Sequence, residues 1–146
     1  MSACTFFGHR DCPESIKPKL KAKIVDLIEC NAVTAFYVGN NGSFDRMVHS
    51  ILRELSGAYP HITYAVVLAY LPSSGGQGGQ DTLLPLGIEK EPRRFAISWR
   101  NRWMLKHSEY VVCYVNHSWR GAAQFTDLAR RQGKIIFNLC EAPLGG

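Results

Sequence analysis

Short apolar segments alternate with longer amphipathic segments along most of this chain, and this alternation restricts the fold more than any other feature of the sequence. Short apolar runs are typical of buried strands, whereas longer segments with apolar residues at helical spacing are typical of helices. The pattern predicts strands at residues 4–7, 35–38, 63–71, 110–115 and 134–139. It predicts helices at residues 14–30, 43–59, 93–108 and 121–132.

Strands that alternate with helices imply a mostly parallel sheet covered on both faces, because parallel neighbours need a crossover connection. Right-handed crossovers then predict a doubly wound, Rossmann-like α/β fold with a five-stranded sheet, in which residues 63–71 form a central strand. The chain of 146 residues has the size of one domain, so we expect residues 1–146 to form a single unit. In such sheets ligands bind outside the carboxyl ends of the strands.

Glycine and polar residues follow four of the five predicted strands. Glycine lets backbone N–H groups approach a ligand, and the start of a helix adds unpaired donors and partial positive charge, so these ends favour phosphate or carboxylate. Ser43 is expected to cap the second helix, with Asp45 in its first turn. The expected ligand-binding residues at the strand ends are Gly8, His9, Arg10, Gly39, Asn40, Asn41, Gly42, Ser43, Asp45, His117, Arg120, Gly121 and Ala122.

A second basic cluster lies on the third predicted helix, where Arg100 and Arg102 stand near Trp99 and Trp103. Arginine can clamp a phosphate and tryptophan can stack on a base, so we expect Arg100 and Arg102 to bind ligand. The alternative interpretation is a helix with two core tryptophans and a solvated basic face. The net charge of +5 favours an anionic partner, either a small molecule or nucleic acid, although a basic surface without an anionic ligand stays open.

Groups suited to catalysis are few. Asp45 and Asp127 are weak catalytic candidates near the starts of helices, and each could instead only cap its helix. We therefore expect a binding protein rather than an enzyme, with no cofactor and no metal site. Five cysteines without paired spacing argue against a disulfide framework and favour a reducing cytoplasm. No apolar run is long enough to predict a membrane span or a membrane partner.

Three segments of the sequence carry a family resemblance. Phe7-Gly8-His9-Arg10 resembles the F-G-H-R opening of the YpsA-like (DUF1273) group in the SLOG superfamily. Residues 100–104 resemble that group's R-N-x-W-M stretch, and residues 121–139 resemble its closing segment. The likeness covers roughly residues 4–139 and implies a Rossmann-like fold that binds nucleotides or nucleotide-derived ligands.

Two further patterns resemble members of the wider superfamily. Gly39, Gly42, Asp45 and His49 resemble the G-x-x-G-x-D-x-x-x-H pattern of DNA-processing proteins. Residues 119–127 occupy the place of the P-G-G-x-G-T-x-x-E motif in the related phosphoribohydrolases. Arg120, Ala123 and Asp127 depart from that motif, and these departures argue against hydrolase chemistry while they preserve an anion-binding helix start.

Three functions follow as hypotheses. The first is a non-catalytic sensor, carrier or sponge for an ADP-ribose-like ligand, a cyclic nucleotide or a nucleoside phosphate. The alternatives are a phosphoribohydrolase-like N-glycosidase acting on nucleoside monophosphates and a single-stranded nucleic-acid binder. We also expect a homo-oligomer, either a dimer or a tetramer. The glycine-rich segment 75–79 is either a lid over the ligand or a slack connection.

Overall fold

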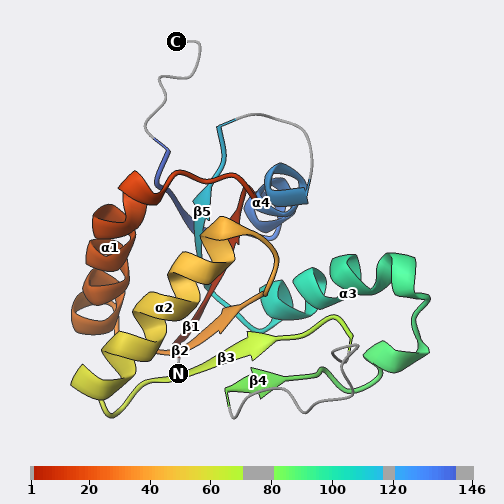
Figure 1. Ribbon diagram of the computed structural model, residues 1–146, viewed down its shortest axis with the longest axis horizontal. Coiled ribbons are helices and arrows are strands. Elements are labelled where there is room, and N and C mark those ends of the chain that lie inside the picture. Colours follow the sequence, from red (N-terminus) through yellow and green to blue (C-terminus); the bar gives the residue numbers. More distant parts are fainter. Residues whose placement is uncertain (1, 71–80, 117–120, 141–146) are drawn as a thin grey trace.

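The computed structural model describes residues 2–70, 81–116 and 121–140, and within these residues it forms a six-stranded parallel sheet with helices on both faces (Figure 1). The strand order is β4-β3-β2-β1-β5-β6. The Rossmann-like α/β architecture expected from the sequence is therefore confirmed. The elements are β1 Ser2–Gly8, α1 Lys17–Cys30, β2 Val33–Val38, α2 Ser43–Ala58, β3 Thr63–Val67, β4 Thr82–Leu83, α3 Arg93–Lys106, β5 Tyr110–Tyr114, α4 Gly121–Arg131 and β6 Ile135–Asn138, with 3-10 turns at Glu14–Ile16 and Ile88–Lys90.

The predicted number of strands was wrong by one, because β4 was not expected. This strand has two residues and joins the sheet edge through N–H groups of Val66 and Leu68, which donate to the carbonyls of Asp81 (2.7 Å) and Leu83 (2.8 Å). A strand this short leaves no apolar periodicity in the sequence. The third predicted strand, 63–71, is also shorter than expected and is next to the edge strand rather than central.

Alternation along β1 divides the core into two layers, because successive side chains of a strand point to opposite faces. Phe6 belongs to the layer beneath α1 and α2 and stacks on Phe36, with ring centres 6.2 Å apart. Phe7 belongs to the layer beneath α3 and α4 and stacks on Phe125 at 5.6 Å. Burial of each such ring stabilises the fold by about 1.5–3 kcal/mol.

The order in which the chain adds strands to the sheet reverses between β1 and β5. From β1 the chain passes through α1 to β2 on one side, while β5 and β6 lie on the other side of β1. The connections α1 and α4 therefore leave these adjacent strands toward opposite faces, as Figure 1 shows. A gap opens above such a switch point, and this is where ligands of open α/β sheets bind. Among the described residues, no helix is both long and apolar enough to cross a membrane.

Candidate functional site

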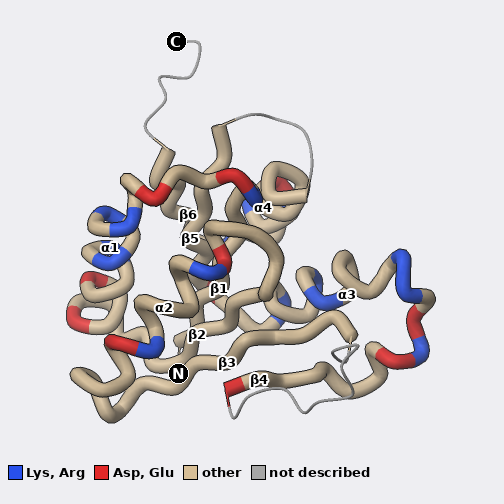
Figure 2. The backbone as a smooth tube through the Cα atoms, viewed as in Figure 1, with Lys and Arg blue, Asp and Glu red and all other residues tan. Residues whose placement is uncertain are grey.

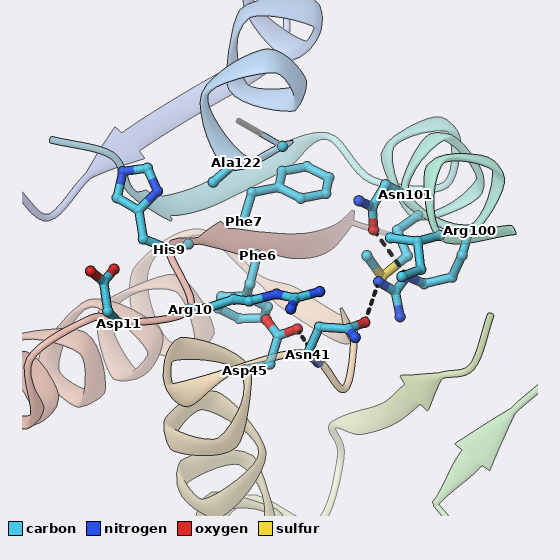
Figure 3. Close-up of a pocket in the computed structure, with 14 residues that line it drawn as sticks. Phe6, Phe7, His9, Arg10, Asp11, Asn41, Asp45, Arg100, Asn101 and Ala122 are labelled. Atoms are coloured by element: carbon cyan, nitrogen blue, oxygen red, sulfur yellow. Dashed lines mark hydrogen bonds between the residues drawn. The ribbon is translucent and has the colours of Figure 1, made fainter. Parts of the chain in front are cut away.

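A cavity of about 810 Å³ lies at the carboxyl end of β1, directly at this switch point (Figure 3). The first turns of α2 and α4 border it on two sides, and one face of α3 closes a third side. The volume falls within the range of about 300–1,000 Å³ that small-molecule sites occupy. The lining residues are Phe6, Phe7, Gly8, His9, Arg10, Asp11, Asn41, Asp45, Ile97, Arg100, Asn101, Met104, Gly121 and Ala122.

Two glycines let the backbone close tightly around the cavity. A Cβ on Gly8 would lie 2.2 Å from the ring of Phe44, so only glycine allows α2 to approach the end of β1. Gly42 has a φ of 94°, and a Cβ there would lie 2.6 Å from the Cα of Arg10. A side chain at either position would push the walls of the cavity apart.

Hydrogen bonds fix the loop after β1 to the start of α2. The Ser43 N–H donates to the Arg10 carbonyl at 2.9 Å, and the Ser43 hydroxyl lies 2.7 Å from the same oxygen and 2.9 Å from the Cys12 carbonyl. The prediction that Ser43 caps the helix was wrong, because Gly42 occupies the cap position and the Ser43 side chain bonds to this loop instead. The loop in turn directs the exposed Arg10 side chain into the cavity (Figure 3).

His9 joins the ends of β1 and β5. Its Nε2 accepts a hydrogen bond from the Asn116 N–H at 3.1 Å, and its ring meets the Tyr114 ring edge-on at 6.3 Å. His9 is buried, and its bond to Asn116 holds the backbone just after β5 against the end of β1.

Arg100 lies buried in the cavity wall, with 2% of its surface exposed. Burial lowers the pKa of its guanidinium, and the nearby Asp45 carboxylate opposes that effect. The guanidinium links α3 to the ends of β2 and β3. Its hydrogen bonds run from Nε to Asn101 Oδ1 (2.9 Å), from Nη1 to Asn40 Oδ1 (3.2 Å) and the Val67 carbonyl (3.2 Å), and from Nη2 to Asn41 Oδ1 (2.9 Å).

Asp45 and this guanidinium both lie close to Gly39. A Cβ on Gly39 would lie 2.9 Å from the guanidinium carbon of Arg100 and 3.0 Å from Oδ2 of Asp45, so a side chain there would displace one of these groups. Burial raises the pKa of Asp45 from 3.8 to about 6, against the N–H bond from Asn41 (2.9 Å) and the charges of Arg100, Arg10 and Arg46. The cavity therefore contains a carboxyl group that changes its charge close to neutral pH.

The structure brings eight of the predicted site residues to the cavity, from the ends of β1 and β2 and from α2, α3 and α4. Four others hold the walls without lining the cavity, namely Gly39, Asn40, Gly42 and Ser43. Arg102 is exposed on α3 and lies outside the lining. Asp127 is exposed on α4, pairs with Arg130 at 2.9 Å and also lies outside the lining. His117, Arg120 and the segment 75–79 lie outside the described residues.

Sequence reasoning missed the side chains that α3 contributes. Ile97, Asn101 and Met104 line the cavity together with the predicted Arg100. Their spacing of four and three residues places them on one face of the helix, so the signal was present in the sequence. Phe6 and Phe7, at the end of β1, also line this cavity.

Trp99 and Trp103 are both half-buried. They are therefore neither fully buried core residues nor fully exposed rings available for stacking on a base. The Trp103 ring meets Tyr37 edge-on at 5.4 Å and stacks on His107 at 4.1 Å, so its faces are used within the protein. Neither tryptophan lines the cavity. Across the described part of the chain, no three His, Cys, Asp or Glu side chains form a group that could hold a metal ion.

The fold and this site define a class of protein, the Rossmann-like α/β proteins with a cavity at the switch point of the sheet. Neither a family model nor a curated protein sequence matches the chain. Among solved structures, the X-ray structure of DNA processing protein A (DprA) from Streptococcus pneumoniae is similar, with a TM-score of 0.71 and 17% sequence identity. The match covers 94% of this chain and 50% of the DprA chain, so this chain spans about half of that protein's length. At this level of identity the similarity shows the fold alone.

Proposed function

We propose that this chain binds a small nucleotide-derived anion in the cavity at the end of β1 and acts as a sensor, carrier or sponge rather than as an enzyme. One observation carries the proposal. A cavity of about 810 Å³ lies at the switch point, where the Arg10 side chain, the loop after β1 and the start of α4 meet. Membership of the YpsA-like group, a cytoplasmic location and a homo-oligomeric state belong to the same proposal, and light scattering tests the last of these.

The two ends of the cavity differ in chemistry, and the difference suggests how a nucleotide would lie. The end formed by Gly8, His9 and Arg10 faces Gly121 and Ala122 at the start of α4. The N–H groups in the first turn of α4, the positive end of that helix and the Arg10 guanidinium favour a phosphate there, while the Asp11 carboxylate, which also lines the cavity, opposes it. The other end presents apolar atoms of Ile97 and Met104 beside the Asn101 amide, which suits a flat ring with a polar edge.

The glycosidase alternative rests on Asp45. Of the two predicted catalytic carboxylates, Asp45 lines the cavity, whereas Asp127 is exposed and pairs with Arg130. A glycosidase needs a carboxylate beside the ribose to stabilise positive charge on the ring. Release of a free base from a nucleoside monophosphate, abolished by Asp45→Asn, would establish this alternative.

Single-stranded nucleic acid is the second candidate partner, and two observations favour it. The structurally similar DprA is named for DNA processing, and several exposed basic residues lie on α3, whose positions along the backbone Figure 2 marks in blue. These side chains are Arg93, Arg94, Arg102 and Lys106. Binding through such a face would weaken steeply as the salt concentration rises.

Isothermal titration calorimetry tests the proposal directly. The probes are ADP-ribose, its cyclic isomers, cyclic dinucleotides, nucleoside monophosphates and a single-stranded oligonucleotide at two salt concentrations. We expect saturable binding of at least one small nucleotide, and Arg10→Ala should weaken it by about tenfold or more, since a charge-assisted hydrogen bond is lost. Arg131→Ala removes the same charge from the exposed end of α4 and should leave the affinity unchanged.

Two outcomes would count against binding of a small nucleotide. An absence of saturable binding to every small probe would contradict the proposed function. Oligonucleotide binding with a steep salt dependence and no binding of mononucleotides would favour the second candidate instead.

A further inference from the structure

The hydrogen bonds of Arg100 determine which way three asparagine side chains point. A guanidinium group has only donors, so each carboxamide that bonds to it must present its oxygen. Asn40, Asn41 and Asn101 all do so, at 3.2, 2.9 and 2.9 Å. The NH₂ group of each carboxamide is therefore turned away from Arg100, because a donor cannot bond to the guanidinium.

Asn101 is the member of this trio that matters most for a ligand. It lines the cavity, and Figure 3 shows its amide nitrogen on the side away from Arg100, toward Phe7. Asn41 also lines the cavity, whereas the exposed Asn40 lies outside its lining. Beside Ile97 and Met104 the polar atom offered to a ring is therefore a hydrogen-bond donor.

Asn41 adds a second donor near the α3 end, because its oxygen is likewise held by Arg100 and its NH₂ group is turned away from the guanidinium. The cavity also contains two carboxyl groups. Asp11 lies next to Arg10 in the chain, at the other end of the cavity, and Oδ2 of Asp45 already accepts the N–H of Asn41 at 2.9 Å. A ligand edge beside Asn101 thus meets a donor and needs an acceptor.

We propose that Arg100 is a positioning residue that sets the base preference of the cavity: by fixing Asn101 as a donor, it selects nucleotides whose base presents an oxo group over those that present an amino group. This inference rests on the proposed function. Guanine, hypoxanthine and uracil carry such an oxygen, while adenine and cytosine place an NH₂ group at the equivalent position. Two donors that face each other in an enclosed site leave both unsatisfied, which corresponds to a preference of about ten- to a hundredfold.

The decisive variant is Asn101→Asp. The aspartate keeps one oxygen for Arg100 and places a second oxygen where the amide nitrogen stood, so the donor becomes an acceptor. Calorimetry with GMP, AMP, UMP and CMP should show that the wild type prefers GMP to AMP and UMP to CMP, and that this variant loses or reverses both ratios. Comparing ratios removes the effect of the added charge on the phosphate, because that effect is common to all four ligands.

Asn31→Asp is the matched control. It makes the same change of charge at the end of α1, outside the cavity lining and away from the hydrogen bonds of Arg100, so both ratios should stay within about twofold of the wild type. Arg100→Lys tests the positioning role itself, since one ammonium cannot hold three carboxamides in place. This variant should bring both ratios toward one while binding of inorganic pyrophosphate is retained.

Thermal unfolding shows which variants fold, and Asn101→Asp keeps the inference testable if Arg100→Lys does not. Equal wild-type affinities for oxo and amino bases, or ratios that Asn101→Asp leaves unchanged, would overturn the inference while the proposed function stands. A wild type that binds none of the four nucleotides would overturn the inference, and the proposed function would fall with it only if ADP-ribose, its cyclic isomers and cyclic dinucleotides also failed to bind.

Discussion

Replacement of Asp45 by asparagine should stabilise the protein at neutral pH and remove a pH dependence of its stability. Asp45 is 7% exposed, and burial raises the pKa of its carboxyl group from 3.8 to about 6. The positive charges of Arg100, Arg10 and Arg46 only partly offset that burial. Ionised Asp45 is therefore less stable in the folded protein than in the unfolded chain, where water solvates it.

The sign and the size follow from proton linkage. Between about pH 4 and pH 6 the folded protein keeps the Asp45 proton while the unfolded chain releases it, so the free energy of unfolding falls as the pH rises. The shift from 3.8 to about 6 is roughly two units, which corresponds to about 3 kcal/mol lost across this window. Above pH 6 both states are ionised and the loss is constant. Asparagine cannot ionise, and its side-chain oxygen can still accept the Asn41 N–H.

Urea unfolding of the wild type and Asp45→Asn at pH 4.5, 6.0 and 7.5 measures this effect. Other titrating groups are shared by the two proteins, so the difference between their free energies of unfolding isolates Asp45. The variant should gain about 2 kcal/mol relative to the wild type from the lowest to the highest pH, because the unfolded chain is already largely ionised at pH 4.5. A difference that stays constant with pH, or one that shifts in favour of the wild type as the pH rises, would refute the reasoning.

Two further predictions concern the cavity walls and the excluded carboxylate. Gly42→Ala should cost about 1–3 kcal/mol in urea unfolding and weaken nucleotide binding, because its Cβ would lie 2.6 Å from the Cα of Arg10 at a positive φ. Gly57→Ala on α2, where a Cβ would meet no described atom within 4 Å, should instead stabilise the fold by about 0.5–1 kcal/mol; equal effects at the two glycines would contradict the account. Asp127→Asn should leave nucleotide affinity unchanged in calorimetry, because the exposed Asp127–Arg130 pair lies outside the cavity, and a clear loss would show that α4 contributes more than its first turn.

The fold could be predicted from the sequence to the extent that each element carries its own pattern. The apolar run 4–7 marks β1 because the strand is buried on both faces, and the apolar stripe of α2 marks that helix equally well. The predicted helix 14–30 begins three residues later, at Lys17, after a 3-10 turn, and Pro18 occupies its first turn, where a missing N–H is tolerated. The edge strand β4 depends on pairing with β3 and has no pattern of its own.

Some residues of the site could likewise be predicted from the sequence, and others could not. Residues that follow β1 and β2 could be identified because the carboxyl ends of parallel strands meet at one edge of the sheet. For α3 the spacing of Ile97, Asn101 and Met104 marks one face of the helix, but that this face meets the cavity depends on how the helix crosses the sheet. Arg100 shows the difference most clearly: the sequence suggested a clamp for a phosphate, and the structure places its guanidinium against Asn40, Asn41 and Asn101.

A crystal structure of the protein grown with saturating GMP tests the central claim most directly. We expect the phosphate within hydrogen-bond distance of the Gly8–Arg10 backbone or the Arg10 guanidinium, next to the first turn of α4. The guanine should lie against Ile97 and Met104, with its O6 toward Asn101. Density for the nucleotide elsewhere on the surface, with the cavity at the end of β1 free of it, would contradict the account.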